Sequence, residues 1–307
     1  MHHELRSADI HRMLRERANW GRWGDDDQLG ALNLVTAEKR VEAAALVRTG
    51  RMVSLSHPIP TRPRPDIPRP AQHLLSVAER GTGGIATDFY GIEYHGLATT
   101  HIDALAHAWD ENGMWQGRDP VDELTSRGAR WGGIERWGGG ILTRGVLLDV
   151  PRFRNGAYVT HETPVHGGEL KAIAASQGVR MRPGDAVFVY SGRAAWDAEN
   201  PVWGSERTAD GRSRRPGLHL SCLDFLRDHD SAVLGWDMLD AAPNPWGLPW
   251  TVHAAIFSYG MALIDNCLLE PLAQACAEEG RYDFMLTVAP LIVPGGTGSP
   301  VNPLASF

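Results

Sequence analysis

The chain has 307 residues, 43% of them hydrophobic and 22% charged, which is typical of a folded globular protein and excludes a disordered, collagen-like or coiled-coil chain. Its formal net charge of -7 argues against nucleic acid as a partner, because surfaces that bind phosphate backbones are basic. No apolar run approaches the roughly 20 residues that span a bilayer, and the N-terminus lacks the apolar core of a signal peptide. We therefore expect a cytoplasmic protein with no membrane partner.

The chain shows no internal repeat and no low-complexity block, so we expect one domain over residues 1–307. Residues 1–35 are expected to form a loop-rich N-terminal arm. Six prolines between residues 58 and 70 exclude a regular element there and predict a surface excursion or a lid. The three cysteines have no C-x-x-C spacing, which predicts neither a disulfide framework nor a thiolate zinc site.

Regular elements are expected from apolar runs and from residues that cap helices. A short strand is expected over residues 52–55, and apolar runs predict buried strands over residues 146–150, 186–190, 232–236 and 261–264. Helices are expected over residues 37–47, 168–176, 222–227, 251–259 and 269–279, with Thr36, Ser221 and Thr251 as N-caps. In the first of these helices Val41, Ala44, Ala45 and Leu46 fall on one face. Strands that alternate with helices at short spacing predict an α/β protein, with a mixed central β-sheet flanked by helices.

One histidine cluster has a spacing suited to metal binding. On an extended segment His101 and Asp103 project to the same face, because side chains alternate along a strand, and His107 returns to that neighbourhood if the chain then turns helical. An imidazole and a carboxylate together suit Zn²⁺ or Mn²⁺. His253 and Asp265 stand at the ends of expected elements, where functional side chains gather in α/β folds. The alternative is a pair of histidines that bond to backbone carbonyls at a polar strand end.

The same segment resembles the metal motif of the cyclase family, which includes bacterial kynurenine formamidase and isatin hydrolase and has the pattern H-x-G-T-H-x-D-x-P-x-H. Four residues match the pattern, namely Thr100, His101, Asp103 and His107, whereas Leu97, Thr99 and Leu105 replace its first His, its Gly and its Pro. The resemblance also covers Trp20 to Val35, the strand that leads into Asp149, and the ending from Pro290 to Pro303.

The resemblance implies a sheet of the swivelling β/β/α type and a homodimer or homotetramer. Carried over position by position, it makes His101 and Asp103 metal ligands and His107 the acid/base, with His253 and Asp265 as the distant metal-binding pair. Leu97 cannot coordinate a metal, so one ligand of a two-metal site is absent, and we expect one divalent transition metal, Zn²⁺ or Mn²⁺. Asp265 is one methylene shorter than the family's Glu and could be either a ligand or a partner of one.

Hydrolysis of an amide or ester needs a nucleophile, stabilisation of charge on the carbonyl oxygen, and a proton for the leaving group. A divalent metal meets the first two needs, and an unligated histidine such as His107 meets the third. We therefore expect a metal-dependent hydrolase that opens a cyclic amide, imide or lactone, or cleaves an aryl amide. The alternatives are a lactone hydrolase or true cyclase of the same family, and a non-catalytic small-molecule binding member that has lost the ligand at Leu97.

Several further residues are candidates for contact with a small, possibly aromatic substrate. Trp20 and Trp23 lie in a Gly-rich loop, His57 precedes a proline, and His219 and Ser221 stand at a helix entrance. Each also has an ordinary structural explanation, such as packing in the core, a loop hydrogen bond or helix capping. His95 is expected to be structural, because it lies two positions before Leu97 and could not replace that ligand without a bulge.

Overall fold

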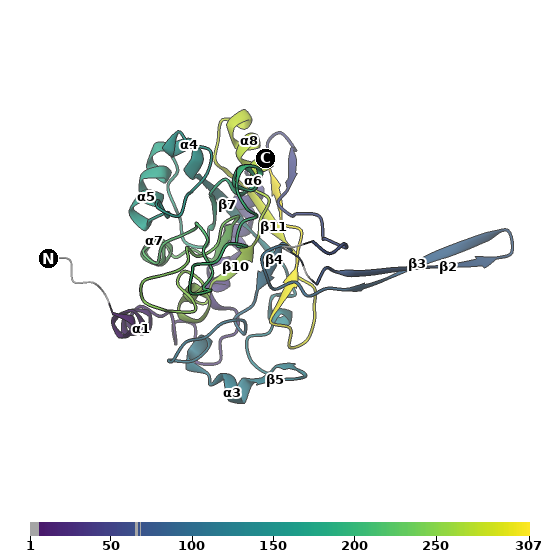
Figure 1. Ribbon diagram of the computed structural model, residues 1–307, viewed down its shortest axis with the longest axis horizontal. Coiled ribbons are helices and arrows are strands. Elements are labelled where there is room, and N and C mark those ends of the chain that lie inside the picture. Colours follow the sequence, from purple (N-terminus) through teal and green to yellow (C-terminus); the bar gives the residue numbers. More distant parts are fainter. Residues whose placement is uncertain (1–5, 65–66, 68) are drawn as a thin grey trace.

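A nine-stranded mixed sheet forms the centre of the molecule (Figure 1). The computed structural model describes residues 6–64, 67 and 69–307, so residues 1–5, 65, 66 and 68 of the expected arm and excursion lie outside the described residues. The strand order is β1-β13-β11-β7-β8-β9-β10-β4-β12. The strands are β1 (Met52–Ser54), β4 (His101–Asp103), β7 (Ile141–Asp149), β8 (Ala186–Tyr190), β9 (Val233–Trp236), β10 (Ala262–Asp265), β11 (Asp283–Val288), β12 (Gly298–Pro300) and β13 (Leu304–Ser306).

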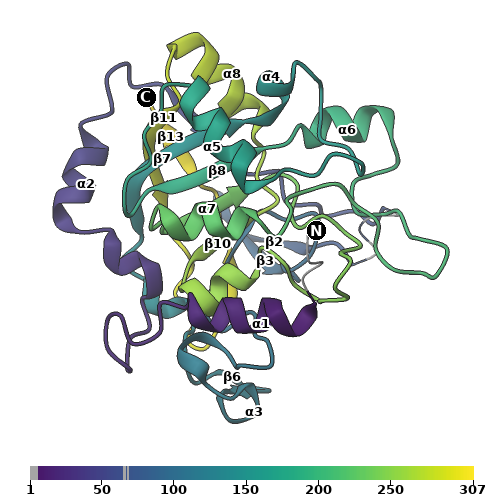
Figure 2. The same ribbon diagram turned by 90° about the vertical axis from the view of Figure 1, so that its left-hand side faces the viewer.

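The middle of this sheet is parallel from β7 through β8 and β9 to β10, and the remaining pairs are antiparallel. The central strands carry apolar side chains on both faces because both faces are covered. Helices α4 (Val150–Arg154), α5 (Gly167–Ser176), α7 (Cys222–Asp228) and α8 (Glu270–Glu279) lie over one face of the sheet, and α2 (Ala37–Ala44) packs against β7 and β11 (Figure 2). The single-domain α/β fold with a mixed sheet is confirmed.

The helices are mostly short. They are α1 (Ser7–Glu16), α2 (Ala37–Ala44), α3 (Pro120–Glu123), α4 (Val150–Arg154), α5 (Gly167–Ser176), α6 (Arg193–Glu199), α7 (Cys222–Asp228) and α8 (Glu270–Glu279), with tighter or wider turns η1 (Gly30–Leu34), η2 (Trp115–Gly117), η3 (Ile134–Trp137) and η4 (Ala255–Tyr259). A small ribbon joins β5 (Leu124–Thr125) to β6 (Gly128–Ala129). No helix among the described residues is long and apolar enough to cross a membrane. The three cysteines are buried and free.

Three local predictions are wrong. The first 35 residues are not simply loop-rich, because Ser7–Glu16 form α1 and bury Ile10 and Leu14. The helix expected over residues 251–259 shortens to η4, since the Asp240 carboxylate, rather than Thr251, accepts the backbone N–H groups at its entrance.

The predicted capping by Ser221 is also absent, because its hydroxyl accepts the backbone N–H of Gly167 from α5 instead of an N–H of its own helix. Thr36 does cap α2, accepting the N–H of Lys39. The face of that helix that carries Val41 does not pack in the core, since Val41 is 71% exposed.

A long hairpin, unexpected from the sequence, projects away from the sheet (Figure 1). It consists of β2 (Gln72–Arg80) and β3 (Gly83–Gly91), paired antiparallel over nine residues each. Residues 58–64 and 69–70, the described parts of the Pro-rich excursion apart from residue 67, contain no helix or strand and lead into it.

A buried ion network fastens α2 to the sheet. Lys39 of α2 is only 6% exposed, and its ammonium group lies 2.5 Å from the fully buried carboxylate of Asp185. Arg144 of β7 donates to the other oxygen of Asp185 at 2.9 Å. Two buried cations therefore share one buried carboxylate as their closest anion, which explains why a lysine occupies the inner face of α2.

Replacing Asp185 by Asn should lower the free energy of unfolding by about 3 to 5 kcal/mol, because it removes the closest anion of two buried cations and leaves them only the more exposed carboxylates of Glu42 and Asp283. Urea denaturation of the full chain measures this. The matched control is Glu278→Gln, which removes the partner of Arg51 at the surface and should cost less than about 1 kcal/mol. Equal losses in the two variants would contradict the assigned role.

Candidate metal centre

Two neighbouring strands bring the predicted ligands to one face of the sheet. β4 runs antiparallel to β10, and His101 lies directly opposite Asp265. Because side chains alternate along a strand, His101 and Asp103 point to the same face, and the register places Asp265 beside them. Ile102 and Ile264 form the pair in between and are fully buried on the other face.

Asp103 is the centre of the group. Its carboxylate is fully buried, and neither oxygen accepts a well-aligned hydrogen bond from any described residue. Four imidazole nitrogens surround it instead, namely Nδ1 of His95 at 3.0 Å, Nε2 of His101 at 3.4 Å, Nε2 of His107 at 3.7 Å and Nε2 of His253 at 4.0 Å. A carboxylate removed from water in this way is costly unless positive charge compensates it.

The outer nitrogens of two of these rings are already bonded. Nδ1 of His101 donates to the carbonyl oxygen of Thr99 at 2.8 Å, and Nδ1 of His253 donates to the carboxylate of Asp240. Since these oxygens only accept, each Nδ1 carries a proton, and the neutral ring has its lone pair on Nε2. Both Nε2 atoms face the buried carboxylates, and that of His253 lies 3.3 Å from Asp265. Lone pairs and carboxylates directed at one point repel each other unless a cation lies among them.

The pKa values show the same demand for positive charge. Burial opposes the imidazolium form of His101, but Asp103 and Asp265 outweigh it and raise its pKa to about 9. Burial likewise opposes the charged form of His253, whereas Asp240 and Asp265 raise its pKa well above the ordinary value. Protons on these rings, or a divalent cation that displaces them, supply the missing charge.

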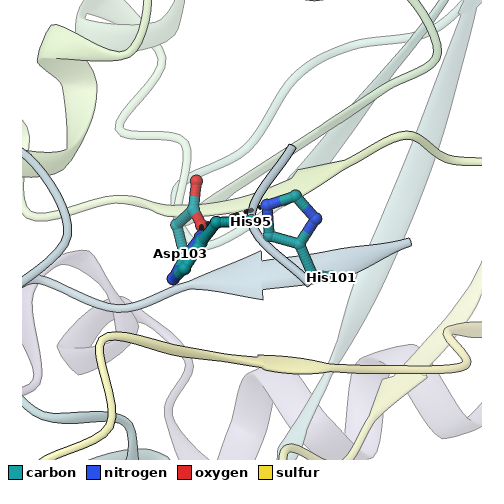
Figure 3. A group of neighbouring side chains, drawn as sticks. All are labelled: His95, His101 and Asp103. Atoms are coloured by element: carbon teal, nitrogen blue, oxygen red, sulfur yellow. Dashed lines mark ion pairs between the residues drawn. The ribbon is translucent and has the colours of Figure 1, made fainter. Parts of the chain in front are cut away.

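Two sets of three residues place one donor atom each within 4.8 Å of the others. One set is His95, His101 and Asp103 (Figure 3), and the second is Asp103, His253 and Asp265. Imidazole nitrogen combined with carboxylate oxygen suits a transition metal rather than Ca²⁺ or Mg²⁺. The residues therefore fit a divalent transition metal, and Asp103 belongs to both sets. The structure thus gathers the four residues that the sequence predicted as ligands.

His95 is the candidate ligand that the sequence argument excluded. The chain before β4 is an irregular loop rather than an extended strand, and Gly96 takes a φ of +151° that side chains rarely adopt. His95 therefore reaches Asp103, while Leu97 does not. Gly298, opposite Asp103 on β12, leaves space for the ring, since a Cβ there would lie 3.0 Å from it. The sequence argument inferred a missing ligand from Leu97 and a single metal from that missing ligand. Because His95 lies close enough to supply a donor, this inference has no basis.

A buried clamp holds this loop against the sheet. The guanidinium of Arg193 donates to the side-chain oxygen of Asn266 at 2.8 Å and to the carbonyl oxygen of Leu97 at 2.5 Å. The side-chain amide of Asn266 donates to the carbonyl oxygens of Gly96 and Thr99. Because the Thr99 carbonyl also accepts from His101, the clamp and the ring orientation share one acceptor.

His107 differs from the other rings in its charge state. It stacks on His95 with ring centroids 4.1 Å apart, and Trp250 lies 6.3 Å away. Burial, which outweighs the opposing effect of Asp103, acts with the neighbouring His95 and His253 to lower its pKa to about 4. The ring is therefore neutral near pH 7 and able to accept a proton.

Trp20 and Trp23, predicted to contact substrate, pack elsewhere. The indole N–H of Trp20 donates to the carbonyl oxygen of Phe257, and Trp23 lies against Trp115 in the N-terminal part of the core. Among the described residues, the aromatic rings beside the histidines of the site are instead those of Tyr94, Trp236 and Trp250.

His57 lies on a pocket behind the metal-site loop. Its backbone N–H donates to the hydroxyl of Thr100, the residue next to His101, and its ring lines a pocket with Arg193 and Ala98. Burial, aided by Arg193, lowers the pKa of His57.

His219 and Ser221 form a second cluster. Nδ1 of His219 lies 3.0 Å from the Ser221 hydroxyl, and the ring makes tilted contacts with His166 and Trp246. His219 and Trp246 line one further pocket, which also includes Thr251. Thr251 donates to Asp240, which also accepts from His253, so one residue on the wall of this pocket is linked to His253 through Asp240.

Sequence reasoning missed two residues of the centre. Asp240 follows β9 at the carboxyl end of the parallel strands, and this position is the signal that could have identified it. The ring centroid of Tyr94 lies 4.6 Å from that of His95 and 6.0 Å from that of His101. Its loop carries no residue spacing that predicts a site.

Comparisons with known proteins identify the family and the fold of this chain. The cyclase family model matches residues 53–243, which is more than half of the chain. A solved structure described as a novel cyclase is 30% identical, covers 96% of this chain and 99% of its own, and has a TM-score of 0.84. A search of curated proteins gave no match.

Two isatin hydrolases share the fold at lower identity. Isatin hydrolase A from Labrenzia aggregata, bound to benzyl benzoate, is 18% identical over 86% of this chain and 94% of its own, with a TM-score of 0.57. An isatin hydrolase bound to the product analogue thioisatinate is 15% identical over 88% of this chain and 98% of its own, with a TM-score of 0.58. The resemblance noted in the sequence is thus confirmed, and the chain belongs to the cyclase family.

Proposed function

We propose that this chain is a metal-dependent hydrolase that opens a small cyclic amide, imide or lactone, or cleaves an aryl amide. The observation that carries the proposal is the buried Asp103 carboxylate, which has four imidazole nitrogens around it and no aligned donor among the described residues. A purely structural carboxylate would be hydrogen-bonded at this depth. Family membership agrees with a site built for a metal.

The residues that would hold the ion are His101, Asp103, His253 and Asp265, with His95 as an additional ligand. A bound Zn²⁺ or Mn²⁺ supplies Lewis acidity and lowers the pKa of a coordinated water. His101 and His253 are oriented for this role, because their Nδ1 atoms are fixed by Thr99 and Asp240.

His107 is proposed as the general acid/base. Its ring is neutral near pH 7, lies at the edge of the group with 19% of its side chain exposed, and can accept the proton of the attacking water. The same ring then donates that proton to the leaving nitrogen or oxygen as the carbonyl carbon–heteroatom bond breaks. The alternative, in which His107 is itself a ligand, is separated by the first test below.

An aromatic substrate is supported by the walls of the site. The half-buried rings of Tyr94 and Trp250 lie against its histidines, and flat rings bind favourably against such side chains. The isatin hydrolases that share the fold were solved with benzyl benzoate and thioisatinate, which are both aromatic. The non-catalytic alternative rested on Leu97 and is weakened by the position of His95.

Removing metal ligands and removing the acid/base should have different effects. We expect His101→Ala and Asp103→Ala to lose both bound metal and turnover, whereas His107→Ala keeps its metal and loses about two orders of magnitude in kcat. Elemental analysis and steady-state rates measure the two properties. His229→Ala, which changes a ring bonded to a carbonyl in α7, is the matched control. Loss of metal in His107→Ala would make that residue a ligand.

The scissile bond can be assigned with matched bicyclic lactam, imide and lactone substrates of the same ring size. We expect ring opening of at least one nitrogen heterocycle, loss of activity on treatment with a chelator, and recovery on adding Zn²⁺ or Mn²⁺, because the buried carboxylates need a cation. Ring opening is followed by absorbance, and the product acid by mass spectrometry. Hydrolysis of the lactone alone would favour a lactonase, and activity that survives complete demetallation would contradict the proposal.

A further inference from the structure

A cavity of about 420 Å³ lies near the metal centre, and the proposed chemistry does not use it. Its walls come from residues between 161 and 164, between 214 and 220, and between 241 and 251. None of the described residues that line it is a candidate metal ligand, and His107 is not among them. The volume suits a small organic molecule. His219, a candidate for substrate contact from the sequence, therefore faces a space that is distinct from the metal centre.

Two rings in the wall of the cavity offer N–H groups. Nδ1 of His219 accepts the backbone N–H of Ser221 at 3.1 Å, so the neutral ring carries its proton on Nε2. Burial, aided by the neighbouring His166, lowers the pKa of His219, which keeps the ring neutral near pH 7. Neither this N–H nor the indole N–H of Trp246 has a hydrogen-bond partner among the described residues. Both are free to donate to a ligand.

Two guanidinium groups add positive charge to the wall. Arg215 is held in place because its Nε donates to the carbonyl oxygen of Asp240 at 2.9 Å. Arg214 lies 3.8 Å and 3.9 Å from the carboxylates of Glu162 and Glu206, which is beyond hydrogen-bond distance. Glu162 is the one carboxylate among the described residues of the wall, and its side chain is 73% exposed. Donors and positive charge without matching acceptors favour an anionic ligand.

The rest of the wall is largely apolar. Leu218, Leu220 and two prolines line the cavity together with Trp246, whose ring centroid lies 5.5 Å from that of His219. A flat aromatic body packs well against apolar side chains and ring faces of this kind. The cavity therefore combines an apolar surface for a ring with donors for an anion.

We propose that this cavity is a second binding site, whose ligand is a small carboxylate with an aromatic body. The guanidinium of Arg214 and the ring N–H groups of His219 and Trp246 bind the carboxylate, and the apolar wall binds the ring. This assignment stands without the proposed hydrolase activity. Opening an aromatic cyclic amide or lactone releases an acid of this class, so the product of the enzyme would fit the cavity, a step that rests on the proposed function.

One loop contacts both the cavity and the metal centre. Trp246 of the loop contacts His219 in the cavity wall, whereas Trp250 of the same loop contacts His253 at the metal centre. A ligand packed against Trp246 restricts the loop and, with it, the position of Trp250. We therefore expect an acid in the cavity to change turnover without competing with the substrate.

Titration calorimetry of the full-length protein with naphthoate, a carboxylate on a bicyclic aromatic ring, tests the ligand class. We expect one site per chain in the cavity. Naphthamide, which lacks the charge, and acetate, which lacks the ring, should each bind at least about tenfold more weakly. Equal binding of naphthamide and naphthoate would overturn the proposal, because the assigned donors would then have no part in recognition.

Variants of the wall test the position of the site. Arg214→Gln and His219→Phe should each weaken naphthoate binding by about tenfold, because each removes a donor to the carboxylate. The matched controls are Arg212→Gln, which changes a guanidinium paired with Asp210, and His229→Phe, which changes a ring bonded to a carbonyl in α7. Both controls should keep the wild-type affinity. Wild-type affinity in Arg214→Gln or His219→Phe would overturn the assigned site.

Steady-state rates test the link to the metal centre. Naphthoate should change kcat for a ring-opening substrate, and Arg214→Gln should need about tenfold more acid for the same effect. Purely competitive inhibition that is equal in Arg214→Gln and the wild type would locate the acid at the metal centre and overturn the link. Calorimetry gives its result even for a protein without hydrolase activity, so failure of the binding site and failure of the proposed function are distinguishable.

Discussion

The carboxylate of Asp103 is the constraint on which the site depends. It is held at the edge of the core, away from water, with imidazole nitrogens on several sides and no aligned donor among the described residues. Such a group persists only if the surrounding structure enforces it and something positively charged offsets it. The register between β4 and β10 places the ligands, and the supporting bonds of His101 and His253 fix which nitrogen of each ring faces the centre.

The support of the centre reaches well beyond the ligands. Arg193 begins α6, Asn266 follows β10, and together they hold the loop that carries His95. Asp237, at the end of β9, in turn accepts the backbone N–H groups at the start of α6. The carboxyl ends of two parallel strands therefore organise both the ligands and the loop opposite them, as in other α/β folds.

The sequence was informative where a single physical rule applied. Apolar runs identified β8 and β9 to within one residue, because a strand covered on both faces has no other composition. Alternation along β4 was sufficient to bring His101 and Asp103 to one face. His95 could not be placed, because its loop follows no period, and the hairpin was missed because its apolar residues are stabilised by nothing within the described chain. The burial of Lys39 could not be foreseen, since only the fold reveals its buried partner Asp185.

The origin of His95 has a consequence for comparing related sequences. An imidazole delivered by an irregular loop can shift by two positions in the chain and still occupy the same space, provided that a glycine absorbs the change in direction and a small residue opposite leaves room for the ring. Alignment columns then record a lost histidine where the three-dimensional arrangement keeps one. The ligands of such a centre are therefore counted more accurately from the three-dimensional structure than from aligned sequence positions.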